Sequence, residues 1–390
     1  MRTKAIPLRV LFLTRYGRLG ASSRQRCFLY LEALNGAGID GDVCPFLGDD
    51  YVHRLHSGLT IGVASILRAY ARRLMLLLRA QRYDLLWIEK EALPWLPAWA
   101  ELALFKLAGT RMVVDYDDAV FHTYDQHRNG IVRRLLGFKI DRIMSAADLV
   151  IVGNSYLGVR AKSAGARAIA EIPTVVDLKC YLERRLAPVR DQEPFTIGWI
   201  GSSLTSSYLE MLRPALAELA SRLPLRIILV GAAEAALAGL PVERVPWSPE
   251  TEATELVRFD VGLMPLPDKP WERGKCGYKL IQYMASAVPV VASPVGINCE
   301  IVIPGETGFL AETDADWLTS LSRLYHEPKL RQTMGAAGRH RVEANYSLAV
   351  TAPRMTDLLQ RLWISSAECW RPSTTDQDLT MGRETHQRGV

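Results

Sequence analysis

Two lysines and an amide recur at helical spacing in the last third of the chain. Lys275, Lys279 and Gln282 follow one another at i, i+4 and i+7, so a helix that begins near Lys275 carries all three on one face. Ammonium groups at a helix start suit phosphate, because free N–H groups and the positive end of the helix dipole point at the same ligand. An amide both donates and accepts hydrogen bonds, as sugar hydroxyls require. The pattern predicts a site for a diphosphate beside a hydroxyl-bearing group.

The surrounding residues predict the elements that position such a site. A glycine-punctuated loop that includes Gly277 leads into a helix over Lys279–Ala287 and a buried strand over Pro289–Ala292. A helix entered through glycine beside a parallel strand is a phosphate-binding arrangement. In the loop that follows, Gly296 lets the backbone approach a ligand. Glu300 either lies near that ligand or stabilises the first turn of the next helix.

A second glycine loop follows the first predicted strand. Gly17 and Gly20 allow a tight turn before a helix over Ser23–Ala37, with Ser23 or its neighbour as the N-cap. On its own such a loop does not establish nucleotide binding. Arg24 and Arg26, in the first turns of this helix, contact an anionic acceptor or remain solvated.

Three aspartates lie at the end of another predicted strand. Asp115, Asp117 and Asp118 form the sequence DYDD. We predict that Asp118 or Asp115 contacts an acceptor hydroxyl or acts as a general base. Two alternatives remain: Asp117 or Asp118 caps a helix, or the Asp115–Asp117 pair binds a divalent metal with a sugar diphosphate.

The alternation of apolar runs with helical stretches predicts an α/β fold. Buried strands alternate with helical stretches in both halves of the chain, which indicates βαβ units and parallel sheets. The predicted strands are Leu8–Leu13, Leu85–Ile88, Arg111–Val114, Leu149–Val152, Phe195–Ile200, Leu225–Val230, Val261–Met264 and Pro289–Ala292. A length of 390 residues suits two domains. We expect two Rossmann-like domains whose strand ends face a shared cleft.

The order of these motifs resembles a known family. The segments GRLGASSRQR, DYDDAVF, GNS, PTVVD, IGWIGSS, YMASAVPVVAS and GETGFL together resemble the retaining glycosyltransferases of family 4, which have the GT-B fold. The resemblance covers roughly nine-tenths of the chain. It implies transfer of a sugar from a nucleotide diphosphate sugar to a saccharide or lipid-linked hydroxyl acceptor, with retention, in surface polysaccharide or glycolipid synthesis. It implies no cofactor and no metal.

The resemblance also implies domain limits. An N-terminal acceptor-binding domain is expected over residues 1–187, and a nucleotide-sugar-binding domain over 188–348. The helix over 349–364 is expected to cross back onto the N-terminal domain. The polar tail 365–390 is expected to be disordered, since it holds too little apolar surface to fold alone.

The chain departs from the family pattern at two donor-site carboxylates. Family members place one glutamate against the donor sugar and a second, eight residues later, against the ribose; these positions hold Gly274 and Gln282 here. Gln282 is still able to bond a ribose, and Glu272 is expected to reach the space that Gly274 leaves empty.

A further departure concerns the diphosphate. Family members place an arginine and a lysine after the first strand of the second domain, where this chain has Gly201, Ser202 and Ser203. Charge on a leaving diphosphate needs electrostatic stabilisation. We therefore expect Lys275 and Lys279 to supply it, with the glycine and serine loop as a further donor contact.

Charge and cysteine content limit the possible partners. The net charge of +5 divides into +10 for residues 1–190 and −5 for residues 191–390, so the first half suits an anionic lipid surface or reflects ordinary solubility. No recognition-helix or zinc motif accompanies it, so no nucleic-acid partner is expected. Six scattered cysteines without CxxC pairs favour a reducing, cytoplasmic location.

A helix over Gly62–Arg79 suggests membrane contact. Apolar residues recur on one face and Arg68, Arg72 and Arg79 on the other. The helix either covers the core or lies on the inner face of the membrane, and no transmembrane segment is predicted. Two other functions remain open: a GT-B sugar-nucleotide epimerase, or a non-catalytic family member that acts as a partner protein.

Overall fold

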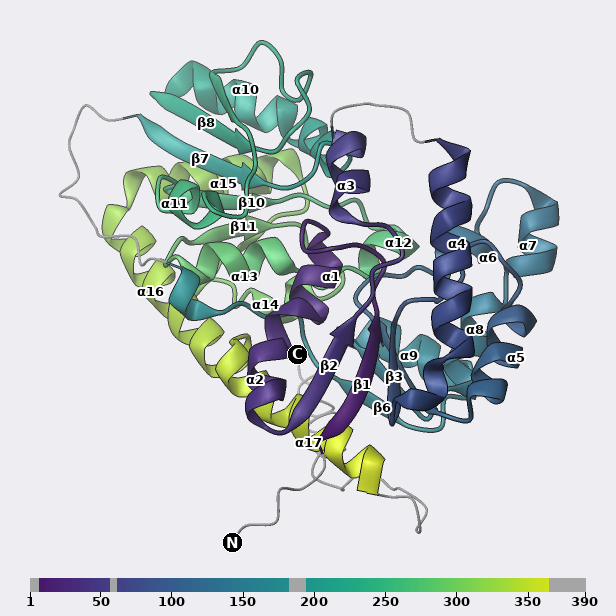
Figure 1. The fold of residues 1–390 in the computed structure, drawn as a ribbon. Coiled ribbons are helices and arrows are strands. Elements are labelled where there is room, and N and C mark those ends of the chain that lie inside the picture. Colours follow the sequence, from purple (N-terminus) through teal and green to yellow (C-terminus); the bar gives the residue numbers. More distant parts are fainter. Residues whose placement is uncertain (1–6, 57–61, 182–193, 365–390) are drawn as a thin grey trace, which may run out of the picture.

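The computed structural model describes residues 7–56, 62–181 and 194–364, which form two α/β units (Figure 1). Each unit contains one six-stranded sheet in which every described pairing is parallel. The predicted fold class is confirmed. The predicted domain boundary at 187 and 188 and the predicted disordered tail over 365–390 lie outside the described residues.

The first sheet has the strand order β2-β1-β3-β4-β5-β6. Its strands are β1 (Leu8–Leu13), β2 (Ile39–Val43), β3 (Leu85–Glu89), β4 (Arg111–Tyr116), β5 (Leu149–Val152) and β6 (Ile169–Glu171). The helices of this unit are α1 (Ala21–Arg26), α2 (Leu31–Gly36), α3 (Asp49–His56), α4 (Val63–Leu78), α5 (Ala98–Ala108), α6 (His122–Asp125), α7 (Gly130–Leu136), α8 (Lys139–Ala146) and α9 (Ser155–Ser163).

The second sheet has the order β12-β11-β10-β7-β8-β9. Its strands are β7 (Phe195–Ile200), β8 (Leu225–Val230), β9 (Val242–Val245), β10 (Val261–Met264), β11 (Val290–Ala292) and β12 (Gly308–Leu310). The helices that follow in sequence are α10 (Arg213–Arg222), α11 (Glu252–Leu256), α12 (Pro270–Arg273), α13 (Tyr278–Ala285), α14 (Asn298–Ile301), α15 (Asp314–His326), α16 (Pro328–Asn345) and α17 (Leu348–Ile364). Short 3-10 helices cover Phe28–Tyr30, Ala80–Arg82, Leu178–Cys180 and Thr205–Leu212.

The central strands are buried on both faces, which is why their sequences read as continuous apolar runs. Every residue of β3, β5 and β7 is buried. The outer strands β2, β6 and β9 contain half-buried or exposed residues, so their sequences lack a run that marks a strand, and they were not predicted.

The predicted helix over Ser23–Ala37 is interrupted. Cys27 has φ −125° and ψ −67°, outside the helical region, and separates α1 from a 3-10 turn and α2. α1 is therefore a short element whose residues contact the second unit. Neither serine caps it, because the N-cap is Gly20 and both serines lie inside the helix. The hydroxyl of Ser23 donates to Glu89.

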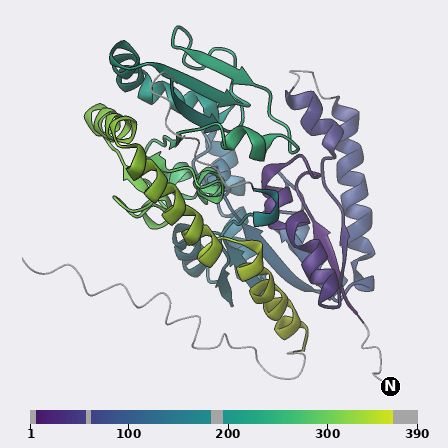
Figure 2. The same ribbon diagram turned by 90° about the vertical axis from the view of Figure 1, so that its left-hand side faces the viewer.

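The last helix packs on the first unit. α16 and α17 run one after the other along the molecule, and α17 reaches the first sheet (Figures 1 and 2). Ala352, Met355 and Leu359 belong to the same buried cluster as strand β1. The hydroxyls of Tyr30 and Thr351 lie 2.9 Å apart. The first unit is thus built from two separated parts of the chain.

Candidate active site

Lys279 lies in the first turn of α13, on the second unit. The helix begins directly after Gly277, whose φ of +64° is a conformation that glycine adopts without strain. The Lys279 ammonium lies 5.4 Å from the centre of the Trp199 ring. Burial, and secondly repulsion from Lys275, lower the pKa of Lys279 from 10.5 to about 7. Attraction to the Asp118 carboxylate offsets part of this fall in pKa, but no carboxylate of the described residues lies within 4.0 Å of the Lys279 ammonium.

Lys275 precedes the helix and does not share its face. The sequence predicted a helix that begins near Lys275 and carries Lys275, Lys279 and Gln282 on one face. α13 begins only at Tyr278, three residues later, so this prediction is wrong. The Lys275 ammonium lies 3.9 Å from Asp118 Oδ1 of the first unit, with 18% of its side chain exposed. The amide of Asn154 donates to the carbonyl oxygens of Gly274 and Lys275, at 3.0 Å each, which fixes this loop across the interface.

The loop after β7 lies beside Lys279. A Cβ on Gly201 would lie 2.5 Å from the Trp199 ring and 2.7 Å from Lys279 Cε, so a side chain there would crowd both residues. Ser202 and Ser203 are exposed, and the Ser202 hydroxyl lies 3.2 Å from that of Thr205. The predicted loop and the predicted lysine therefore come together, and the loop carries hydroxyl groups that a ligand can reach.

Glu272 is already engaged by a tyrosine. It is 6% exposed, and the Tyr208 hydroxyl donates to its carboxylate. Burial and then this bond raise the pKa of Tyr208. The neighbouring Gly274 is packed against the first unit: a Cβ there would lie 2.5 Å from Ala119 Cβ and 2.9 Å from Ala119 N. A side chain at position 274 would push the two units apart, so a glutamate there does not fit this interface.

Asp115 lies in the interior. It is 1% exposed, and Arg26, also 1% exposed, donates to both of its oxygens at 2.6 and 2.9 Å. Burial raises the pKa of Asp115 in spite of Arg26. Arg26 also donates to the carbonyl of Ile172. The structure therefore contradicts both a base role for Asp115 and an acceptor contact for Arg26, because the two side chains are buried and occupy each other.

Asp118 is the exposed member of the aspartate group. Its side chain is 27% exposed. The Lys90 ammonium lies 3.0 Å from Asp117 Oδ1, 3.4 Å from Asp118 Oδ2 and 3.1 Å from the Ser22 hydroxyl. Burial favours the neutral form of Asp117, but Lys90, the Ser22 hydroxyl and Arg26 together outweigh it and lower the pKa of Asp117. A lysine thus occupies the position next to these carboxylates that a metal requires. Within the described ranges, no group of three potential metal ligands occurs.

Lys90 was missed by the sequence reasoning. It directly follows β3 and has a φ of +66°, which is uncommon for a residue with a side chain. Its two neighbours are buried glutamates that fix the loop. Glu89 accepts from the Ser23 hydroxyl at 2.6 Å, and Glu91 lies 2.7 Å from the Lys139 ammonium. The charged sequence EKE directly after an apolar strand is the one feature of the sequence that could have marked Lys90 as a site residue.

Gly17 and Gly20 shape the turn before α1. A Cβ on Gly17 would overlap the carboxylate of Asp49, which accepts from the backbone N–H of Leu19 at 2.9 Å. A Cβ on Gly20 would lie 2.4 Å from Tyr16 Cβ. Close packing therefore requires both glycines, and their approach to a donor phosphate stays a prediction.

Gln282 faces a buried network and not an open site. It is 2% exposed and donates to the Tyr181 hydroxyl at 3.2 Å. That hydroxyl donates to Glu252 at 3.0 Å and lies 3.2 Å from the hydroxyl of Tyr278. From the first unit, Arg24 lies 3.6 Å from Glu252. The network joins the two units, and a ribose contact by Gln282 does not follow from it.

Gly296 and Glu300 line a cavity between the two units. Gly296 has φ +54°, and a Cβ on it would lie 2.7 Å from the Arg273 carbonyl oxygen. Glu300 accepts from the Ser155 hydroxyl at 3.3 Å. The cavity has a volume of about 440 Å³ and is formed by the start of α9 on one side and by the loops around α12 and α14 on the other.

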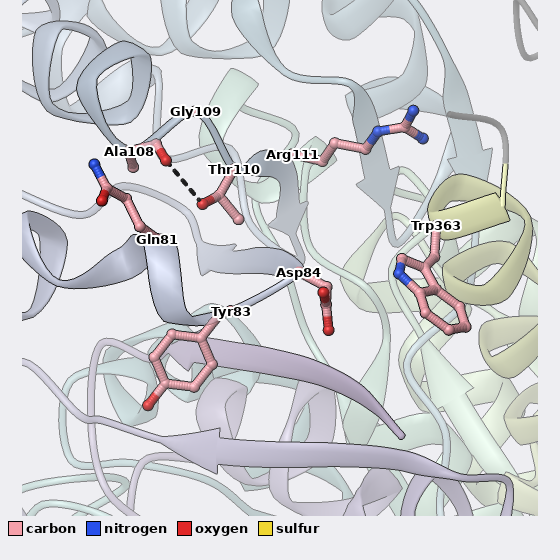
Figure 3. Close-up of a pocket in the computed structure, with 8 residues that line it drawn as sticks. All are labelled: Gln81, Tyr83, Asp84, Ala108, Gly109, Thr110, Arg111 and Trp363. Atoms are coloured by element: carbon pink, nitrogen blue, oxygen red, sulfur yellow. Dashed lines mark hydrogen bonds between the residues drawn. The ribbon is translucent and has the colours of Figure 1, made fainter. Parts of the chain in front are cut away.

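A second cavity lies where the strands of the first sheet begin. It has a volume of about 360 Å³ (Figure 3). Its lining residues are Gln81, Tyr83, Asp84, Ala108, Gly109, Thr110, Arg111 and Trp363. Ligands of open α/β sheets bind at the carboxyl ends of the strands, and no predicted site residue lines this cavity.

Part of the sequence matches a known family. Residues 194–327 match the model described as Glycosyl transferases group 1. The solved structures agree on the architecture. Sucrose-phosphate synthase from Thermosynechococcus elongatus superposes with a TM-score of 0.71 at 18% identity, over 92% of this chain and 100% of that one. The fold is GT-B.

Other GT-B structures and two mannosyltransferases are also similar. Anabaena Alr3699/HepE in complex with UDP-glucose gives a TM-score of 0.67 at 17% identity, over 90% of this chain and 99% of that one. A GDP-mannose-dependent alpha-(1-6)-phosphatidylinositol monomannoside mannosyltransferase of Mycolicibacterium smegmatis is 27% identical over 300 residues, which are 68% of this chain and 75% of that protein.

The monoacylated counterpart from Corynebacterium glutamicum is 40% identical over 86 residues, only 22% of either chain. The family match and the GT-B neighbours support a glycosyltransferase that uses a nucleotide sugar.

Proposed function

We propose that this protein is a retaining glycosyltransferase of family 4 that transfers a sugar from a nucleoside diphosphate sugar to a hydroxyl acceptor. The observation that carries the proposal is Lys279, a lysine at a helix start, with a lowered pKa and no ion pair among the described residues. A ligand phosphate would supply the missing negative charge. Lys275 and the loop Gly201–Ser203 complete the diphosphate site, and Asp118 contacts the acceptor hydroxyl.

The acceptor is proposed to be lipid-linked, in glycolipid or surface polysaccharide synthesis at the inner face of the membrane. Support comes from the names of the two mannosyltransferases, which act on phosphatidylinositol mannosides. No helix among the described residues is long and apolar enough to span a bilayer. A lipid-linked acceptor therefore calls for a surface by which the protein approaches the membrane.

The outer face of α4 suits that purpose. The sequence placed its apolar residues together, but the structure divides them. Tyr70 and Leu77 pack inward, while Val63 is 74% and Leu67 is 63% exposed. Leu74 and Leu78 continue the exposed strip, and α5 packs beside α4 with Trp99 68% exposed (Figure 1). Exposed apolar residues flanked by arginines favour an anionic lipid surface.

The donor is tested by thermal shift with UDP, GDP and ADP. A ligand present at 100 times its Kd should stabilise the protein by about 2.7 kcal/mol. We expect one diphosphate to raise Tm and the matching nucleoside to have no effect. Product analysis by NMR then tests retention, and an inverted anomeric centre would remove the family 4 assignment. Isomerised sugar without any acceptor would favour an epimerase, and the absence of any diphosphate effect would favour a non-catalytic partner protein.

Membrane contact is tested by co-sedimentation with vesicles that contain phosphatidylglycerol. Leu67→Ser with Leu74→Ser should reduce binding. Leu204→Ser provides the matched control, because Leu204 is 80% exposed on the second unit. Equal loss in both variants would argue against a specific face.

A further inference from the structure

Asp118 lies between two lysines that come from opposite sides of the interface. Lys90 of the first unit approaches Oδ2 at 3.4 Å, and Lys275 of the second unit approaches Oδ1 at 3.9 Å. The two lysines differ in their other contacts. Lys90 also contacts Asp117 at 3.0 Å, whereas Asp118 is the one carboxylate that the described residues place in an ion pair with Lys275.

We propose that Asp118 and the donor diphosphate compete for Lys275, so that donor binding frees Asp118 Oδ1 for the acceptor hydroxyl and the donor binds before the acceptor. This rests on the proposed function. Lys90 is the positioning residue: it holds Oδ2 and keeps the carboxylate in place when Lys275 leaves.

The surroundings suit these two roles. Lys90 is held by a loop whose neighbouring glutamates are buried, and its side chain is 12% exposed. If the Lys90 ammonium moved away, Asp117, which is 9% exposed, would become a buried charge without a partner. Lys275 has a longer contact with Asp118 and a more exposed side chain. A diphosphate carries more negative charge than one carboxylate, so Lys275 is the cation that changes partner.

The charge at the interface then changes with the ligand. Without donor, Lys90 contacts Asp117 and Asp118, and Lys275 contacts Asp118. When the diphosphate takes Lys275, Asp118 loses its ion pair across the interface and keeps only the contact with Lys90. Asp118 is the carboxylate that is accessible. An acceptor hydroxyl can then donate to Oδ1, a position that Lys275 occupies in the free protein.

The test is the affinity of the full-length protein for whichever of UDP or GDP raises its Tm, measured by calorimetry. Asp118→Asn should tighten binding roughly two- to fivefold, the range that a partly exposed ion pair supplies. Lys90→Met should weaken binding by a similar factor, because Asp118 then turns to Lys275, and Lys90→Arg should restore it. Asp118→Ser serves if the asparagine variant is unstable.

Double variants separate competition from a general charge effect. In a Lys275→Met background, Asp118→Asn should no longer tighten binding, and in an Asp118→Asn background, Lys90→Met should no longer weaken it. Additive effects, or looser binding by Asp118→Asn, would overturn the proposal while leaving the enzyme assignment intact. If neither diphosphate binds the wild-type protein, it is the proposed function that fails.

Discussion

The two sides of the interface use charged residues in different ways. On the first unit, Arg26 and Asp115 are paired and buried, and Lys90 contacts two aspartates. On the second unit, Lys279 has a tryptophan ring beside it and a lowered pKa. Paired charges hold a structure together, whereas a lysine that feels Asp118 only beyond ion-pair distance is suited to bind an anion. The charges of the first unit hold the interface in place, whereas Lys279 of the second unit is suited to bind a ligand.

The largest effect should come from breaking the buried pair on the first side. Removing one partner leaves an uncompensated buried charge, which costs about 3–5 kcal/mol of unfolding free energy. Arg26→Met and Asp115→Ala should each show this loss in urea denaturation. Asp118→Asn, at a half-buried position, should change stability by less than about 1 kcal/mol. A stable but inactive Asp115→Ala variant would support a catalytic role for Asp115 after all.

On the second side, Lys279→Ala should impair function more than stability. A charge-assisted contact contributes about 1.5–3 kcal/mol, so turnover should fall roughly ten- to a hundredfold. Lys275→Ala should have a smaller effect. Nucleoside lacking phosphate should bind each variant as it binds the wild type. If the double variant retains near-normal turnover and diphosphate affinity, the phosphate site lies elsewhere.

A Lys279→Met variant should gain stability, whereas the variants that break the Arg26–Asp115 pair should lose it. Folding lowers the pKa of Lys279 from 10.5 to about 7, so the unfolded chain binds the proton more tightly. The charged Lys279 therefore destabilises the folded protein. This destabilisation is at its full size below pH 7 and disappears as the pH approaches 10.5. Lys279→Met should therefore raise Tm at pH 6.5. A lower Tm would mean that the lysine contributes to the fold.

The same pKa predicts how diphosphate binding depends on pH. The free protein loses the Lys279 proton as pH rises through about 7, and affinity should then decline by up to about tenfold per pH unit. Calorimetry between pH 7 and 9 measures this decline. Lys279→Arg is the control, since arginine stays charged over that range. A decline that persists in the arginine variant would belong to another group.

The last substitution concerns Gln282. Gln282→Glu would place a carboxyl at a position that is 2% exposed, beside the Tyr181 hydroxyl, which already donates to Glu252. A buried carboxylate without a cation should cost about 3–5 kcal/mol of unfolding free energy at pH 7.5. The loss should shrink as the pH falls and the added carboxyl protonates, because burial beside Glu252 raises its pKa. Unchanged stability with improved turnover would favour a ribose contact after all.

The sequence predicted the fold well because the central strands are buried on both faces. Runs such as Phe195–Ile200 and Leu225–Val230 have the same limits in the structure as in the prediction. The sequence assigned Lys279 and the loop Gly201–Ser203 to one diphosphate site. The two segments lie beside each other, and their contact with a diphosphate stays a prediction.

The sequence could not separate residues that share a motif but point in opposite directions. Asp115 and Asp118 lie three residues apart, yet Asp115 is buried against Arg26. That partner comes from 89 residues away, and no local pattern marks it. Lys90 was missed for the same reason, because its importance arises from Asp117, Asp118 and Ser22, which approach it in three dimensions.

The position of α17 has a consequence for how the chain is made. The ribosome releases the first sheet early, but the residues that cover its apolar face, among them Met355 and Leu359, are synthesised only after the whole second unit. Because domains tend to fold in order of synthesis, the first unit must wait with an uncovered surface until the second unit and α17 have been translated. A chaperone has its longest opportunity to bind there, and a fragment that stops before residue 348 would keep that surface permanently exposed.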